Sequence, residues 1–141
     1  MPILVKKLTP ESILPKYVRD GDAAMDLYAN ETAIINPQER KIIATGIAMA
    51  VPSNYVGLIW DRSGMAANHG IKTMGGVLDP NYRGELKIIL HNLSSQPFTV
   101  EKGMRIAQMI IHSIEPQQIL EVQDLDETNR GEKRFGSSGM F

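Results

Sequence analysis

Glycine and proline are spread along the whole chain and divide it into short apolar segments. Twelve glycines and eight prolines are distributed over 141 residues rather than gathered in one linker. Most of the segments between them are four to ten residues long and rich in Ile, Val and Leu: Ile3–Leu8, Ala33–Ile35, Lys41–Val51, Tyr55–Trp60, Ile71–Leu78, Leu86–Leu90, Phe98–Val100, Ile106–Ile114 and Ile119–Val122. Short strands separated by turn residues predict an all-β sandwich or barrel in one domain.

Local patterns refine this prediction in two places. Leu86, Ile88 and Leu90 alternate with polar neighbours, as in a strand with one buried face, but Ile89 interrupts the alternation. We therefore expect both faces of that strand to be covered. The one segment with helical character follows Ser63, which we expect to cap a short helix over Gly64–His69, ended by Gly70 in the left-handed conformation.

The composition excludes several classes of protein. The chain has no cysteine, so disulfides and thiolate chemistry are excluded. Its net charge of -1 argues against a sequence-independent nucleic-acid binder, which normally carries a basic excess. No apolar run approaches the length of a membrane span. We therefore expect a cytoplasmic protein with neither a nucleic acid nor a membrane as its partner.

The segment from Gly75 to Gly84 permits two interpretations. Asp, Pro, Asn and Gly are the residues of turns, so a plain hairpin loop accounts for all of it. Alternatively, Asp79 stands at a strand end as a general base, with Tyr82 offering a flat face to a ring.

A similar choice arises at Arg62-Ser63-Gly64. A short helix opening with these residues presents free amides and a guanidinium to an anion, whereas the plain interpretation is a helix cap beside a surface ion pair. Further along, Gln108 is either a satisfied core amide or a donor facing a cleft. Asp26, between apolar residues, is more often a structural acceptor than a metal ligand. Trp60 is expected to be a core residue, and the three histidines are expected to be structural.

From about Thr128 the sequence changes in character. Fourteen residues contain three glycines, two serines and three cations, with no apolar run to bury, so a mobile arm over residues 128–141 is expected. Cations and hydroxyls suit a polyphosphate, and one phenyl ring suits stacking on a base. The residues concerned are Arg130, Lys133, Arg134, Phe135, Ser137 and Ser138.

Five motifs, in order and at matching spacings, resemble the trimeric dUTP pyrophosphatase (dUTPase) family. They are Ala23–Leu27, Arg62–Ala66, Gly76–Gly84, Gly103–Gln108 and Arg130–Gly139. The resemblance implies a distorted jelly-roll β-barrel over residues 1–127 and a C-terminal arm. It also implies a homotrimer with shared active sites. The implied activity is hydrolysis of dUTP to dUMP and pyrophosphate with Mg²⁺, which lowers dUTP and supplies dUMP for thymidylate synthesis.

The resemblance also implies roles for individual residues. Asp79 would activate the attacking water, Tyr82 would pack on the deoxyribose, and Asp26 would meet the metal through water. The remaining assignments fall into three groups: Gly76, Val77, Leu78 and Lys87 at the uracil edge; Arg62, Ser63, Gly64 and Gln108 on the phosphate chain; and Arg130, Phe135, Gly136, Ser137 and Ser138 closing from the arm, with Phe135 over uracil.

Several positions depart from the family pattern. Asp61 stands where proline is common, and we expect it to pair with Arg62 or Arg105. Met104 replaces an aspartate, and Lys133-Arg134 replaces a pair of glycines. Two alternatives on the same fold remain: a dCTP deaminase, which would need a glutamate where this chain has Ile89, and a dUTP-binding sensor without catalysis.

Overall fold

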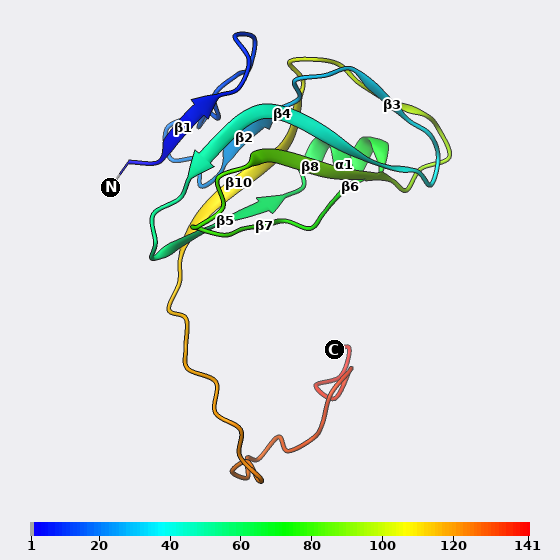
Figure 1. The fold of residues 1–141 in the computed structure, drawn as a ribbon. Coiled ribbons are helices and arrows are strands. Elements are labelled where there is room, and N and C mark those ends of the chain that lie inside the picture. Colours follow the sequence, from blue (N-terminus) through cyan, green and yellow to red (C-terminus); the bar gives the residue numbers. More distant parts are fainter. Residues whose placement is uncertain (1) are drawn as a thin grey trace.

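In the structure, a computed structural model that describes residues 2–141, all of the regular secondary structure is β-strand except for one short helix (Figure 1). The all-β prediction is therefore confirmed. The ten strands and one helix are β1 Leu4–Lys7, β2 Met25–Tyr28, β3 Ala33–Ile35, β4 Arg40–Ala50, β5 Tyr55–Trp60, α1 Ser63–His69, β6 Ile71–Met74, β7 Val77–Leu78, β8 Glu85–Asn92, β9 Phe98–Val100 and β10 Arg105–Ser113.

The strands form two four-stranded antiparallel sheets and one short pair. The first sheet has the order β1-β4-β8-β6 and the second β2-β10-β5-β7, while β3 pairs with β9. Neighbours in each sheet are distant in sequence, so the chain crosses repeatedly between the sheets. This arrangement brings β2, β5 and β10 side by side, with Gln108 of β10 opposite Asp26 on one side and Trp60 on the other.

Side chains from both large sheets meet in one core. Ile43, Ile88 and Leu90 come from the first sheet, and Leu27 and Met109 from the second; all five are at most 1% exposed. Strand β8 alternates as the sequence predicts, and Ile89 on its other face is half-buried, which agrees with partial cover on both faces. The core therefore holds the two sheets as a rigid support for the loops at their ends.

Helix α1 differs from the sequence prediction at its start. The residue preceding the helix is Arg62, in an extended conformation, and no side chain caps the helix, so the prediction that Ser63 is the cap is wrong. Asp61 is hydrogen-bonded to Thr73 of β6, which keeps the chain extended through Arg62 and places Ser63 inside the first turn. The end is as predicted: Gly70 has φ 65° and its amide donates to Ala66.

Three strand predictions also need correction. The segment Ile71–Leu78 is two strands, because the chain bends at Gly75, with φ 62°, and at Gly76. A Cβ at Gly76 would lie 2.5 Å from the Ile59 carbonyl oxygen, so this bend requires glycine. Strand β2 was not among the expected segments, and Ile119–Val122, which was, forms no strand.

The chain leaves the body of the protein after β10. Every residue from 115 to 141 is exposed, and Figure 1 shows this segment running away from the sheets. The boundary at residue 128 between a barrel domain and an arm stays a prediction. Among residues 2–141, no helix is long and apolar enough to cross a membrane.

Candidate active site

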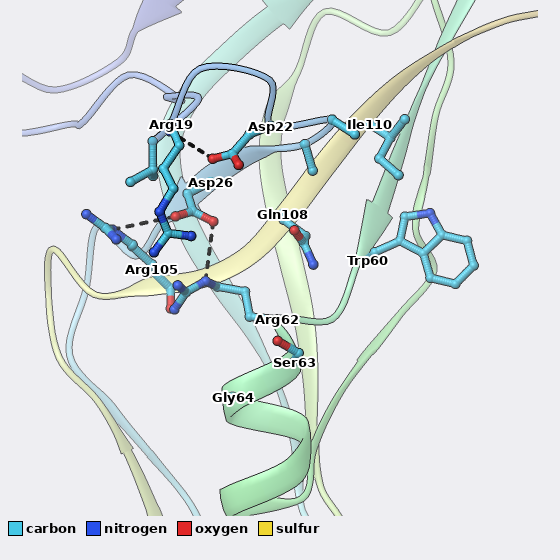
Figure 2. Close-up of a pocket in the computed structure, with 13 residues that line it drawn as sticks. Arg19, Asp22, Asp26, Trp60, Arg62, Ser63, Gly64, Arg105, Gln108 and Ile110 are labelled. Atoms are coloured by element: carbon cyan, nitrogen blue, oxygen red, sulfur yellow. Dashed lines mark hydrogen bonds and ion pairs between the residues drawn. The ribbon is translucent and has the colours of Figure 1, made fainter.

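The first candidate site is a cleft of about 600 Å³ beside the start of α1, here called the helix cleft (Figure 2). It contains all five residues that the sequence analysis assigned to the phosphate chain and the metal: Asp26, Arg62, Ser63, Gly64 and Gln108. They come from β2, from the start of α1 and from β10. The pairing of β2 and β5 with β10 is what brings these separate motifs into one cleft.

Two arginines share one carboxylate on the wall of the helix cleft. The Nε of Arg62 lies 3.3 Å from Asp26 Oδ1, and the Nε of Arg105 lies 3.6 Å from Oδ2. Figure 2 shows both guanidinium groups reaching Asp26, which is only 8% exposed. With Arg19 and Asp22 also lining the cleft, three cations face two carboxylates, so the cleft has a net positive charge and suits an anion.

The opening of α1 adds hydrogen-bond donors to this charge. The first amides of an α-helix have no acceptor within the helix, and no side chain caps these. A Cβ added at Gly64 would meet nothing within 4 Å, so the backbone there is open to a ligand. The first turn of α1 therefore offers backbone donors next to Arg62.

Gln108 and Trp60 stand side by side on β10 and β5. Gln108 Nε2 donates to the Asp61 carbonyl oxygen at 2.7 Å, and the side chain is half-buried on the cleft wall. Gln108 is therefore both a hydrogen-bonded amide and a residue facing the cleft, the two alternatives that the sequence left open. Trp60 is 54% exposed and lines the same cleft, so its prediction as a core residue is wrong; it lies at the end of β5, where the sheet gives way to the cleft.

The pairing predicted for Asp61 is also wrong. Its carboxylate bonds Lys72 and Thr73 of β6, while Arg62 and Arg105 pair with Asp26. Burial alone would raise the pKa of Asp61, but the Thr73 hydroxyl and amide and the Lys72 ammonium outweigh it and lower the pKa below the ordinary value. Asp61 is therefore held in its charged form.

Sequence reasoning missed several residues of the helix cleft. Arg105 was quoted within a motif but given no role, although it shares the Asp26 carboxylate. The turn before β2 contributes Arg19, whose amide donates to Asp22 at 2.8 Å. The sequence Arg-Asp-Gly-Asp, with Gly21 at φ 86°, is a turn signal that could have marked this loop but not its position beside β10.

The second candidate site is a smaller cleft of about 210 Å³, here called the hairpin cleft, beside the long loop of the β6–β8 hairpin, which contains β7. It is lined by Val77, Leu78, Asp79, Tyr82 and Lys87, all of which the sequence analysis singled out. The Asp79 side chain is exposed, so it is accessible to solvent or a ligand.

The hairpin cleft has a fixed backbone and a positioned aromatic ring. The Ile59 amide donates to the Gly76 carbonyl at 2.7 Å, which fastens the hairpin to β5. The Tyr82 hydroxyl donates to the Glu85 carbonyl at 3.0 Å, and an added Cβ at Gly84 would overlap the Tyr82 ring. Glycine at position 84 therefore lets the ring lie across the turn, as a wall of the cleft.

One chain does not bring all of the predicted residues together. The helix cleft and the hairpin cleft share no lining residue. The third group of predicted residues (Arg130, Phe135, Gly136, Ser137 and Ser138) lies in the exposed C-terminal segment and lines neither cleft. In that segment the Arg134 guanidinium lies 5.4 Å from the centre of the Phe135 ring, which is 93% exposed.

The acidic groups fit a magnesium ion that arrives with a phosphate rather than a resident metal centre. Within residues 2–141, no cluster of three or more His, Asp or Glu side chains is placed to hold a metal ion. Mg²⁺ retains several waters and needs only one or two carboxylates when phosphate oxygens supply other ligands. Both carboxylate oxygens of Asp26 already face an arginine, at 3.3 and 3.6 Å, so a metal ion held here would be reached through water rather than bound directly.

Comparison with known proteins identifies the family. The family model described as dUTPase matches residues 10–139. The chain is 48% identical to the deoxyuridine 5'-triphosphate nucleotidohydrolase of Clostridium kluyveri, and the match covers 100% of both chains. A mutant dUTPase of Staphylococcus bacteriophage 80alpha, solved with dUpNHpp, is 29% identical with a TM-score of 0.92, over 99% of both chains.

A third protein shares the fold at lower identity. The dUTPase of the S. aureus phage phi11, in a mutant form described with a structural Mg(II) ion, has a TM-score of 0.84 and is 23% identical, over 90% of this chain and 100% of its own. The protein belongs to the dUTPase family and is an enzyme of that family. The likeness to solved dUTPases also confirms the predicted distorted jelly-roll.

Proposed function

We propose that the protein hydrolyses dUTP to dUMP and pyrophosphate, with water as the nucleophile. One observation carries the proposal: a cationic cleft with free backbone amides and a rigid hairpin with an exposed carboxylate occur in one chain of the dUTPase family. The first suits a triphosphate, and the second suits a base and sugar together with an activated water. The reaction would lower dUTP and supply dUMP for thymidylate synthesis, in the cytoplasm.

The hairpin cleft is assigned the nucleoside and the water. Asp79 accepts a proton from the water as its oxygen attacks the α-phosphorus, and pyrophosphate leaves from the opposite side. Tyr82 walls the deoxyribose and leaves no space for a 2′-hydroxyl. The backbone at Gly76, Val77 and Leu78, with Lys87, pairs with the uracil edge, which a hairpin fastened to β5 can do in a fixed order.

The helix cleft is assigned the phosphate chain. Arg62, the amides of Ser63 and Gly64, and Gln108 orient the phosphates and offset their charge, which is the main contribution that a protein makes to phosphoryl-type transfer. Bound with the substrate and reached by Asp26 through water, Mg²⁺ would supply further charge neutralisation.

We further propose that each active site is completed by other subunits of a homotrimer. This follows from the absence of any shared lining residue between the two clefts and from the position of the C-terminal segment outside both. Arg130, Gly136, Ser137 and Ser138 would close on the γ-phosphate, and Phe135 would cover uracil. Such closure excludes water other than the nucleophile.

The activity is tested by measuring pyrophosphate release from dUTP, with Mg²⁺ and with EDTA, beside dCTP, dTTP and UTP. Release from dUTP alone, dependent on Mg²⁺ and lost in Asp79→Asn, supports the proposal. dUTP binding without turnover would indicate a sensor instead. Formation of dUTP or dUMP from dCTP would indicate a deaminase instead. A deaminase would need a catalytic glutamate at position 89, where this chain has the hydrocarbon side chain of Ile89.

Subunit sharing is tested by coexpressing two inactive chains, Asp79→Asn and Arg62→Ala. If the hairpin cleft of one chain works with the helix cleft of another, random mixing in a cyclic trimer makes about a quarter of the sites intact. Activity near that fraction of the wild type is expected. If both clefts of one chain served the same substrate, no mixed trimer would contain an intact site, and the activity would stay at background.

A further inference from the structure

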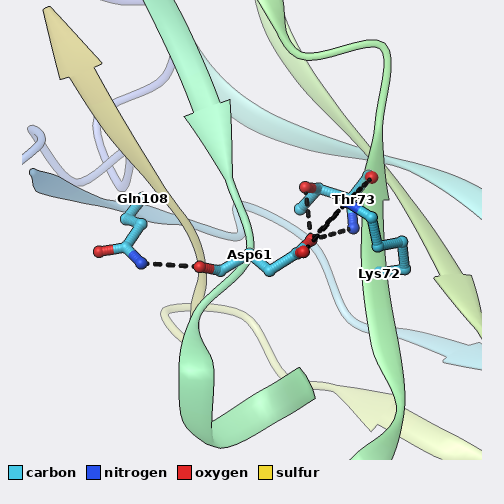
Figure 3. Close-up of polar contacts among 4 residues, drawn as sticks. All are labelled: Asp61, Lys72, Thr73 and Gln108. Carbon is cyan, nitrogen blue, oxygen red and sulfur yellow. Dashed lines mark hydrogen bonds and ion pairs between the residues drawn. The ribbon is translucent and has the colours of Figure 1, made fainter. Parts of the chain in front are cut away.

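Asp61 connects strands β6 and β10 through different parts of the same residue (Figure 3). Its carboxylate faces β6: Oδ1 accepts the Thr73 amide at 2.6 Å and the Thr73 hydroxyl at 2.7 Å, and Oδ2 lies 3.0 Å from Lys72 Nζ. Its carbonyl oxygen faces β10, where it accepts Gln108 Nε2. Figure 3 shows Asp61 between these two groups.

The carboxylate is held more firmly than a surface ion pair. Three donors converge on it, two of them from Thr73, whose side chain is buried, and the Asp61 side chain is only 22% exposed. Hydrogen bonds to an ionised acceptor are stronger than neutral ones, and a backbone donor has no rotamer freedom to lose. The backbone of Asp61 is thereby fixed relative to β6.

The fixed carbonyl decides how Gln108 faces the cleft. A carbonyl oxygen only accepts, so the amide nitrogen of Gln108, not its oxygen, must point at Asp61. One N–H of the amide is used in this contact. The second N–H and Oε1 remain available to a ligand in the cleft. Their orientation depends on the position of the Asp61 carbonyl.

The same anchor sets the start of the next element. Arg62 follows Asp61 directly, remains extended and pairs with Asp26, and the helical turn begins at the next residue. A shift of the Asp61 backbone would displace Arg62 and the open amides of Ser63 and Gly64 together. The donors of the helix cleft that we assign to the phosphate chain therefore depend on one carboxylate that is not itself part of the lining of the cleft.

We propose that Asp61 is a positioning residue for the triphosphate: its bonds to Thr73 and Lys72 hold the carbonyl that orients Gln108 and the turn that presents Arg62, Ser63 and Gly64. This inference rests on the proposed function of the helix cleft. If Asp61 were only a structural cross-link between β5 and β6, its removal would lower stability and would affect the recognition of phosphates and of the nucleoside equally. Positioning affects the phosphates alone.

The experiment compares Asp61→Ala, Asp61→Asn and Thr73→Val with the wild type. Glu39→Gln is the matched control, because Glu39 also accepts a backbone amide, from Asn36 at 2.8 Å, and pairs with Lys41 at 3.8 Å, outside both clefts. The measurements are kcat and KM for dUTP, inhibition constants for dUpNHpp and for deoxyuridine, which has no phosphate, and the melting temperature.

In Asp61→Ala we expect kcat/KM to fall about 10- to 100-fold, because small misplacements of binding groups are costly in this kind of catalysis. The inhibition constant of dUpNHpp should rise about tenfold or more, while that of deoxyuridine stays within about twofold. Asp61→Asn, which keeps acceptors for Thr73, should recover part of the loss. Thr73→Val removes one donor to the Asp61 carboxylate and should raise the inhibition constant of dUpNHpp about fivefold. Glu39→Gln should match the wild type.

An equal rise in the inhibition constants of deoxyuridine and dUpNHpp would overturn the inference. An unchanged inhibition constant of dUpNHpp in folded Asp61→Ala would also overturn it. If Asp61→Ala does not fold, Thr73→Val decides the matter by the same two inhibition constants. Absence of pyrophosphate release by the wild type would instead overturn the proposed function, and this outcome is read before any variant is compared.

Discussion

The shared carboxylate of the helix cleft gives the sharpest prediction, for the substitution Asp26→Asn. At 3.3 Å, the Arg62–Asp26 attraction is about 5 kcal/mol for an effective dielectric constant of about 20. Most of this is offset by lost hydration, and the two arginine side chains are 33% and 45% exposed. We therefore expect the free energy of unfolding to fall by only about 1–2 kcal/mol for the two pairs together.

The effect on anion binding has the opposite sign. Asp26→Asn raises the net charge of the cleft from three cations against two carboxylates to three against one. An added unit of positive charge about 6 Å from a phosphate is worth about 0.7 kcal/mol per ligand charge in water, before screening. We therefore expect dUpNHpp to bind roughly tenfold more tightly in EDTA. With Mg²⁺, turnover of dUTP should fall about 10- to 100-fold, because the contact that we propose between Asp26 and a metal-bound water would be lost.

Trp60 provides the assay. It is the one tryptophan of the chain, is 54% exposed and lines the helix cleft, so its fluorescence should report ligand binding there. Asp22→Asn is the control, since it removes a carboxylate from the same cleft that pairs with an amide rather than with a guanidinium. It should also bind dUpNHpp more tightly in EDTA but retain turnover with Mg²⁺. Weaker binding of dUpNHpp by Asp26→Asn in EDTA would refute the charge argument.

Three further substitutions test other parts of the structure. Gly76→Ala forces a Cβ against the Ile59 carbonyl and should lower stability by about 1–3 kcal/mol, measured by urea unfolding; an unchanged midpoint would contradict the tight fit of the hairpin. Phe135→Ala, at a side chain 93% exposed, should leave the melting temperature unchanged but raise KM for dUTP, and an unchanged KM and kcat would exclude a closing arm. Because the pKa of Asp61 is lowered in the folded protein, its contribution to stability is complete above the ordinary aspartate range and is lost as pH falls through the lowered pKa. Urea unfolding of Asp61→Asn at decreasing pH should lack this part of the acid dependence.

The sequence predicted the class of fold because the positions of glycine, proline and apolar residues mark strands whatever their partners. It missed β2, whose residues Met25–Tyr28 are all buried and include an acid, so that neither alternation nor an apolar run is present. It misplaced Trp60 because a large aromatic residue at a strand end is buried or exposed according to which loop lies over it. Both errors arise where tertiary contacts outweigh local pattern.

The motifs also identified several residues of both clefts but not their partners. Asp26 and Arg105 are far apart in sequence and meet only because β2 pairs with β10. Asp61 was expected to pair with a neighbour in sequence, yet its partners lie on β6, to which the chain returns after α1. Residue type and spacing therefore predict which side chains take part in a site. The pairing of the strands determines which of several available cations each carboxylate contacts.

The separation of the two clefts has a physical reason in the size of the chain. A triphosphate needs an open, cationic surface, whereas reading a base needs a rigid backbone at close range. Here the cationic surface lies where β2, β5 and β10 of one sheet meet the start of α1. The rigid backbone lies where the hairpin is hydrogen-bonded to β5. A chain of 141 residues that supports both with one core has no further layer to enclose the ligand between them. Sharing sites between copies would provide that enclosure, and the exposed segment from residue 115 onward is long enough to reach beyond its own body.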